Sequence, residues 1–131
     1  HAAILSERLK WLEAFTESRR QVADMYLKKI SNPKVRLLAR PQDPSNHVYH
    51  LFVLLIDQRE QLLNHLEKSG VASLSHYPIP IHHQEPCLQI KKDPRGLLHA
   101  EKHARECLSI PCHPQITDPQ REKVIEAINA F

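Results

Sequence analysis

Residues 75–86, which read SHYPIPIHHQEP, limit the possible folds of this chain more than any other stretch. Each proline fixes its own φ angle and lacks a backbone N–H group, so the three prolines exclude a helix or a central strand here. The same segment holds three histidines and a tyrosine, and prolines keep such side chains in place without a hydrogen-bond ladder. The sequence therefore predicts an ordered binding loop, with the rest of the chain as its support.

The bulk composition predicts one soluble globular domain. A length of 131 residues allows one domain to bury most of its apolar surface, and 41% hydrophobic with 25% charged residues argues against disorder. The net charge is only +3 and the basic pairs are scattered, so nucleic-acid binding is not predicted. Three cysteines without Cys-x-x-Cys spacing favour the reducing cytoplasm over a disulfide framework. No apolar run reaches the roughly 18 residues of a membrane span.

Hydrophobic periodicity predicts helices along much of the chain. Apolar residues recur every three or four positions over residues 1–30, which predicts one long amphipathic helix that Asn32-Pro33 ends. Its first turns extend beyond the core, so we expect them to rest on a neighbour outside these residues. Three shorter helices are expected: one capped by Asp57 with Glu60 and ended by Gly70, one over residues 97–108, and one that begins with a capping box at Thr117.

The strands are predicted between these helices. Residues 47–56 are β-branched, aromatic and almost continuously apolar, which is typical of a central strand. Residues 71–74 are predicted to form a second strand and residues 35–38 a short extended piece. Residues 109–112 are expected to form an edge strand, because Pro111 cannot donate to a central ladder. The expected fold class is α+β, with a small, mostly antiparallel sheet of about three strands backed by helices.

The ten histidines raise the question of a metal site. His99, His103 and Cys107 follow one another at steps of four on one predicted helix face, but three ligands spread over about two turns are too far apart for one tetrahedral ion. A pair of them with Cys112 or His113 remains an alternative, although a solvated helix face is favoured. Cys112 beside His113 is interpreted as a buried structural cysteine, because adjacent residues rarely point at each other.

His76 and Tyr77 are the strongest candidates for ligand contact. They follow the predicted strand at residues 71–74 directly, and Pro78 and Pro80 hold them. Together they can donate hydrogen bonds to, and accept them from, sugar hydroxyls or a carboxylate. On composition alone, ligand contact and a structural turn are equally supported. The chain contains no glycine-rich phosphate loop, no Gly-x-Ser-x-Gly and no paired-carboxylate motif.

Residues 70–86 read GVASLSHYPIPIHHQEP, and this run resembles the pattern Gly-(Ile/Val)-x-x-x-x-His-Tyr-Pro-x-Pro-x-His-x-Gln of the DegT/DnrJ/StrS family of pyridoxal-phosphate-dependent sugar aminotransferases. Other family motifs occur in order: AAIL at residues 2–5, HVYHLFV at 47–53, and AE, ARE, LSIP and HPQIT between residues 100 and 117. His1 stands where the family usually has glutamine. The resemblance covers essentially the whole chain.

The resemblance implies that residues 1–131 form the small C-terminal domain of an aspartate-aminotransferase fold. The larger N-terminal domain, with its Schiff-base lysine, is absent from the chain. The complete enzyme would move an amino group, usually from glutamate, to a nucleotide-linked keto-sugar through pyridoxal phosphate, in the cytoplasm and as a homodimer. The chain alone would bind no cofactor and would be inactive.

Position by position, the resemblance also implies roles in substrate binding. His76 and Tyr77 match the pair that faces the sugar in some family members, and His82 and Gln84 match the loop positions that follow. His83 occupies a variable position and inherits no role. We therefore expect four substrate-binding residues, with no catalytic and no metal-binding residue in this chain.

Two other functions stay open. The chain could be a stand-alone module that binds a sugar nucleotide or a protein without catalysis, or a zinc-dependent regulator that uses its histidines. A lysine-bearing domain encoded in frame upstream would favour the enzyme. Metal analysis of the purified chain would test the regulator.

Overall fold

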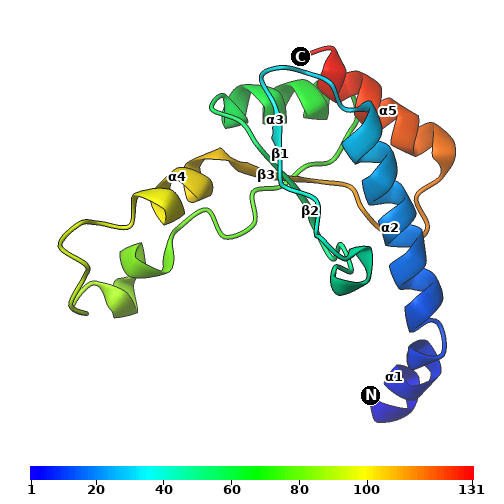
Figure 1. The fold of residues 1–131 in the computed structure, drawn as a ribbon, viewed down its shortest axis with the longest axis horizontal. Helices are drawn as coiled ribbons and strands as arrows, with labels where there is room; N and C mark the ends of the chain where they lie inside the picture. Colours follow the sequence, from blue (N-terminus) through cyan, green and yellow to red (C-terminus); the bar gives the residue numbers. More distant parts are fainter.

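A three-stranded antiparallel sheet lies at the centre of the structure, a computed structural model that describes residues 1–131 (Figure 1). Strands β1 (Arg36–Leu37), β2 (Phe52–Leu55) and β3 (Cys107–Ile110) are ordered β1-β2-β3. In the central pair, Phe52 lies opposite Ile110 and Leu55 opposite Cys107. The predicted α+β class is confirmed, and so is the central position of the strand within residues 47–56.

Five α-helices and three short 3₁₀ turns complete the fold. The α-helices are α1 (Ala2–Leu9), α2 (Leu12–Lys29), α3 (Arg59–Lys68), α4 (Leu98–Glu106) and α5 (Asp118–Asn129). The 3₁₀ turns are η1 (Pro44–Asn46), η2 (Ile81–His83) and η3 (Glu85–Cys87). None of the helices is both long enough and apolar enough to cross a bilayer.

The hydrophobic core lies between the sheet and helices α2, α3 and α5. Alternate residues of β2 are buried, so Phe52 and Leu54 enter the core while the residues between them are half-buried. The Tyr26 ring meets the Phe52 ring edge to face at 5.2 Å, and the Tyr26 hydroxyl donates a 2.8 Å hydrogen bond to the Pro111 carbonyl. Through these contacts of Tyr26, the core fixes the position of α2 relative to the sheet and to the residue that follows β3.

The prediction of one continuous helix over residues 1–30 is wrong at Lys10 and Trp11. The Trp11 N–H bonds to the Arg8 carbonyl, three residues back instead of four, and α1 turns away from the axis of α2 (Figure 1). No residue of α1 is buried. The sequence periodicity shows only that these residues share an apolar face. In this chain nothing packs against α1, so no tertiary contact keeps α1 and α2 in one continuous helix. Large apolar side chains stay exposed at Ile4, Leu5, Leu9, Trp11 and Leu12.

Two predictions around α3 are wrong. Asp57 does not cap the helix: Gln58 precedes it without a side-chain bond, and Asp57 instead pairs with Arg36. Residues 71–74 form no strand beyond a single bridge, in which Leu74 pairs with Ser109 on the free edge of β3. The prolines that follow prevent further pairing. The helix end is as predicted, because Gly70 adopts φ +68° in the left-handed region.

The boundary between α4 and β3 also differs from the prediction. The helix ends at Glu106, and Cys107 and Leu108 belong to the strand instead of the predicted helix. Pairing with β2 decides this, since Leu108 lies opposite Leu54 and both are fully buried. The edge position of this strand is confirmed. The last helix is also confirmed, with a capping box in which the Thr117 N–H donates to Gln120 Oε1 at 2.9 Å.

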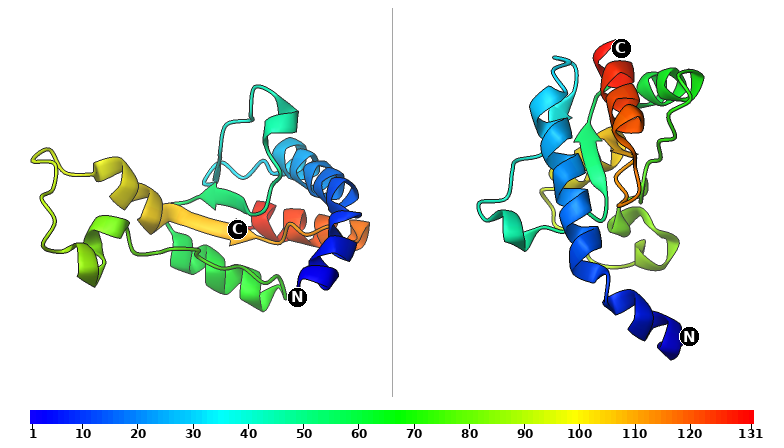
Figure 2. Two further views of the ribbon diagram at one scale, coloured as in Figure 1. Left: turned by 90° about the horizontal axis from the view of Figure 1, so that it is seen from below. Right: turned by 90° about the vertical axis from the view of Figure 1, so that its right-hand side faces the viewer.

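Residues 77–106 form an arm that extends away from the sheet (Figures 1 and 2). The chain runs outward through η2 and η3 and returns through α4, which leads directly into β3. The arm is attached to the sheet at both ends, through the Leu74 bridge to β3 and through α4, and it carries the histidine and proline loop on its outgoing half.

Candidate functional site

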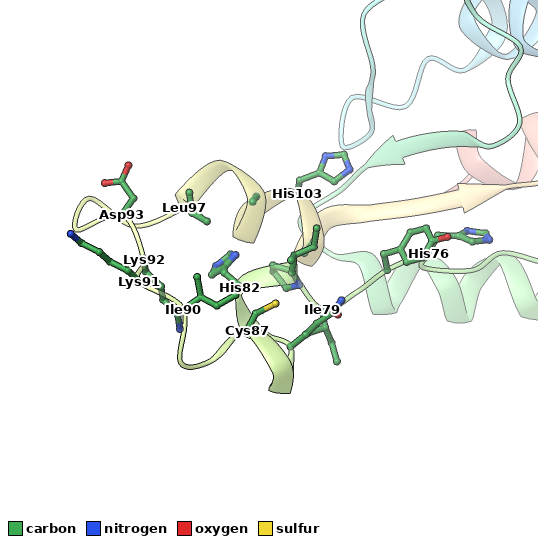
Figure 3. Close-up of a pocket in the computed structure, with 16 residues that line it drawn as sticks. His76, Ile79, His82, Cys87, Ile90, Lys91, Lys92, Asp93, Leu97 and His103 are labelled. Carbon is green, nitrogen blue, oxygen red and sulfur yellow. The ribbon is translucent and has the colours of Figure 1, made fainter.

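An open pocket of about 910 Å³ lies in the arm, lined by the loop of residues 75–86, by residues between Cys87 and Leu97, and by helix α4 (Figure 3). This volume lies in the range of small-molecule binding sites. All four residues predicted to bind substrate line it: His76, Tyr77, His82 and Gln84. Isoleucines and Leu97 supply apolar surface between the polar groups. The structure thus brings the predicted residues to one cavity; whether they bind a substrate stays a prediction.

His76 lies at the end of the cavity nearest the sheet (Figure 3). Its Nδ1 is 2.9 Å from Ser109 Oγ, and Ser109 is buried in β3. This hydrogen bond fixes the ring plane and leaves Nε2 to donate or accept elsewhere. The bridge between Leu74 and Ser109 anchors the backbone just before His76. The sheet therefore orients this imidazole.

Tyr77 has an unusual backbone for a large side chain, with φ +56°. A non-glycine residue in the left-handed region costs of order 1–2 kcal/mol, and such strain persists only where the surroundings impose it. Pro78 follows directly, and the preceding residue is held by β3. The side chain is 84% exposed, so the strain aims an aromatic ring and a hydroxyl into solvent instead of the core. Strained, exposed aromatics of this kind are typical of ligand contacts.

His82 and Gln84 lie further along the arm, around η2. His82 is mostly buried, and its Nε2 is 3.2 Å from Glu101 Oε1 on α4. Gln84 is exposed, and its backbone N–H donates to the Ile81 carbonyl at 3.1 Å. His82 thus joins the loop to α4, whereas the side-chain amide of Gln84 makes no hydrogen bond within the chain and can contact a ligand.

The outer rim of the cavity carries Lys91, Lys92 and Asp93 (Figure 3). Hydrogen bonds from Arg95 hold the pKa of the Asp93 carboxyl below its usual range, so this group is ionised at neutral pH. The Asp93 carboxylate forms an ion pair with the Arg95 guanidinium, which largely neutralises its charge. The two lysines leave the rim with a positive balance that suits an anionic group of a ligand.

Cys112 has the structural role predicted for it. Burial raises the pKa of its thiol to about 11, so the thiol is protonated and a poor nucleophile at neutral pH. Its Sγ lies 3.8 Å from the Arg19 carbonyl, and His113 is exposed. These two residues form no nucleophile and base pair.

The structure also bears on the first metal hypothesis. Cys107 is buried in β3, where its Sγ lies near Ser75 and the His76 carbonyl, while His99 and His103 remain exposed on α4. These three side chains do not converge. A different group does: ligand atoms of His82, His83 and Glu101 all lie within 4.8 Å of one another.

Sequence reasoning missed two residues at the site, Ser109 and Glu101. Ser109 is 33 positions from the His76 that it orients, and Glu101 is 19 positions from His82. Both fall within motifs of the family resemblance, LSIP and AE, and this was the only signal that marked them. No local pattern connects them to the loop.

The small antiparallel sheet with its helices and the loop motif define a domain of the aminotransferase type. The chain belongs to the DegT/DnrJ/EryC1/StrS aminotransferase family, whose model matches residues 1–129. Among solved structures, S. venezuelae DesV in complex with a ketimine intermediate superposes with a TM-score of 0.89 at 33% identity, over 98% of this chain and 35% of that one. A DegT/DnrJ/EryC1/StrS aminotransferase from Brucella abortus gives 0.90 at 27% identity, over 99% and 34%.

Curated relatives point to the same family. The dTDP-3-amino-3,6-dideoxy-alpha-D-galactopyranose transaminase of Aneurinibacillus thermoaerophilus is 34% identical over 130 residues, 99% of this chain and 35% of its own length. The dTDP-3-amino-3,4,6-trideoxy-alpha-D-glucose transaminase of Streptomyces venezuelae is 35% identical over 132 residues, 99% of this chain and 34% of its own length. The chain therefore spans about a third of the relatives it matches.

Proposed function

We propose that this chain is the C-terminal domain of a pyridoxal-phosphate-dependent aminotransferase that transfers an amino group, from glutamate, to a nucleotide-linked keto-sugar. The transaminases of dTDP-amino sugars among its relatives support this substrate class. One observation carries the proposal: His76, Tyr77, His82 and Gln84, which the family pattern marks, line one cavity of suitable size. The domain would form one wall of the sugar site.

In this proposal, pyridoxal phosphate is bound by another domain of the complete enzyme and not by residues 1–131. Pyridoxal phosphate supplies an electron sink, and the protein must provide a lysine for its aldehyde and an acidic partner for its ring nitrogen. The cavity lining does not fit it: Lys91 and Lys92 lie exposed on the arm, and the single carboxylate there, on Asp93, is paired with Arg95. The chain alone is therefore expected to be inactive.

The residues of this chain would bind and orient the sugar. His76, held through Nδ1 by Ser109, would use Nε2 to hydrogen-bond one sugar hydroxyl in a fixed direction. Tyr77 would place its ring against the sugar face and its hydroxyl on a second oxygen. The lysines at the rim would attract the nucleotide phosphates by their charge. Each group positions the substrate, while the chemistry takes place at the cofactor.

We also propose a cytoplasmic homodimer for the complete enzyme, with the remaining domain against α1. The three cysteines are free, which agrees with a reducing compartment. The exposed apolar side chains of α1 and its junction with α2 are the surface that another domain would cover.

A non-catalytic binding module is the second candidate, because the cavity is built by this chain alone. The two functions are separated by assaying the complete polypeptide and the 131-residue chain with glutamate and a dTDP-keto-sugar. We expect transamination and a cofactor absorbance band for the complete polypeptide and neither for the chain. A complete polypeptide that binds the sugar nucleotide without cofactor or turnover would support the module and contradict the enzyme.

A further inference from the structure

His82, His83 and Glu101 form a cluster of which the proposed sugar site uses only His82. The two histidines end the 3₁₀ turn η2, and Glu101 lies in the first turn of α4. Their ligand atoms all lie within 4.8 Å of one another. Figure 3 shows His82 in the space between the loop and α4. The cluster therefore connects the outgoing and returning halves of the arm.

The backbone of the turn is fixed before any ligand is added. The His83 N–H donates to the Pro80 carbonyl at 2.9 Å, and the Gln84 N–H donates to the Ile81 carbonyl at 3.1 Å. The tight turn brings the rings of His82 and His83 to the same side, with centroids 4.2 Å apart. Adjacent side chains seldom share a direction, so this convergence needs a common partner.

The common partner in the structure is a single carboxylate oxygen. Glu101 Oε1 is 3.2 Å from His82 Nε2 and 3.9 Å from His83 Nε2. No lysine or arginine lies within ion-pair distance of Glu101, so its charge faces the two imidazoles alone. Its side chain is 26% exposed and that of His82 only 14%. A partly desolvated carboxylate of this kind favours a cation among the three groups.

The spacing suits a transition-metal ion. Zinc bonds of about 2.0–2.2 Å in a tetrahedron place neighbouring ligand atoms about 3.4 Å apart. The distances from Glu101 Oε1 to the two imidazole nitrogens fall on either side of that value. The 49% exposure of His83 leaves room for its ring to turn and for a water molecule in the fourth position. Two imidazoles and one carboxylate are a donor set that Zn²⁺ prefers.

We propose that His82, His83 and Glu101 bind one Zn²⁺ ion that joins η2 to α4. The ion takes the imidazole nitrogens and one carboxylate oxygen, and a water molecule completes the tetrahedron. Its role is to hold the two halves of the arm together, because its ligands come from both. This inference does not rest on the sugar aminotransferase proposal, and it replaces the expectation that no residue here binds metal.

The test is isothermal titration of the purified chain with ZnCl₂ in a non-chelating buffer, followed by visible absorption of the Co²⁺-substituted chain. We expect one ion per chain and the absorption bands of tetrahedral Co²⁺. His83→Ala and Glu101→Gln should each weaken Zn²⁺ by more than the roughly 10–100-fold that follows loss of an outer-shell partner. His83 is half exposed, so its replacement leaves the core intact.

His99→Ala is the matched control, because His99 is exposed on α4 two positions before Glu101. Its Zn²⁺ affinity should equal that of the unaltered chain, and circular dichroism should show the same helix content for all variants. Absence of zinc binding would overturn the proposal. Binding that survives both His83→Ala and Glu101→Gln would overturn it as well, since the ion would then lie elsewhere.

Discussion

Replacement of Ser109 by alanine tests how His76 is held. The hydroxyl is 2.9 Å from His76 Nδ1, and both backbone hydrogen bonds of Ser109 to Leu74 are unaffected by the change. Loss of one neutral hydrogen bond costs about 0.5–1.5 kcal/mol. If the complete enzyme uses this bond to orient the imidazole on the sugar, kcat/KM for the keto-sugar should fall by about 2- to 13-fold.

The chain offers a matched control in Ser75. Its hydroxyl also lies in the half-buried surroundings of β3, but it accepts a hydrogen bond from Arg59 Nη1 at 3.2 Å and does not touch the His76 ring. Ser75→Ala should therefore lower the melting temperature about as much as Ser109→Ala, by roughly 3–5 °C per kcal/mol in a domain of this size. Its kinetics should be unchanged. Ser109→Thr keeps the hydroxyl and should restore most of the activity.

The assay combines steady-state kinetics of the complete enzyme with nitrogen NMR of the His76 ring in the chain. Ser109→Ala should change the ratio of the two imidazole tautomers, and Ser75→Ala should not. Equal kinetic losses in both alanine variants would refute the argument, because the effect would then come from stability. An unchanged His76 spectrum in Ser109→Ala would refute it too.

Three further outcomes are expected. Tyr77→Gly relieves the strain at φ +56° and should leave the free energy of unfolding unchanged or raise it by up to about 1 kcal/mol, while weakening sugar binding; a clear loss of stability in urea would mean that the ring has a packing role. The pKa of the Cys112 thiol is raised by burial from 9.0 to about 11, so the proton is bound more tightly in the folded state, and the stability this contributes is complete below pH 9 and lost as pH rises toward 11. Denaturation measured from pH 7 to 11 should show a drop that Cys112→Ala makes smaller, the remainder coming from buried Tyr26, whose pKa burial also raises, and an equal drop in that variant would contradict it. The isolated chain should bind a hydrophobic dye through α1, and Leu5→Glu with Leu9→Glu should reduce the signal; a monodisperse chain without dye binding would count against an exposed docking face.

Local signals predicted those parts of the fold in which neighbouring residues decide the structure. Gly70 ends α3 because it can take a positive φ angle, and Thr117 with Gln120 starts α5 through side-chain bonds that a short motif specifies. The central strand was predictable because its residues are apolar and β-branched or aromatic. Its first half was not, since Tyr49 at φ +45° interrupts the extended run before Phe52.

Tertiary contacts decided the remaining parts. Helical periodicity continued through Leu108, but pairing opposite Leu54 made that residue part of a strand. The break at Lys10 and Trp11 depends on the lack of a partner for α1, which periodicity does not report.

The candidate site divides in the same way. His76 and Tyr77 could be singled out because they stand together in a proline-fixed segment. Their surroundings could not, because Ser109 and Glu101 reach the loop only through the return of the chain along α4 and β3. The convergence of His82 with His83 depends on a 3₁₀ turn that the sequence did not indicate.

The kinetics of His76→Ala in the complete enzyme test the central claim most directly. His76 is held by β3 at the inner end of the cavity, so its imidazole should contact the keto-sugar and not the cofactor. We predict a raised KM for the keto-sugar or a lowered turnover, with the absorbance of the bound cofactor and the KM for glutamate unchanged. A variant with normal sugar kinetics per folded molecule and only a lower melting temperature would contradict the account.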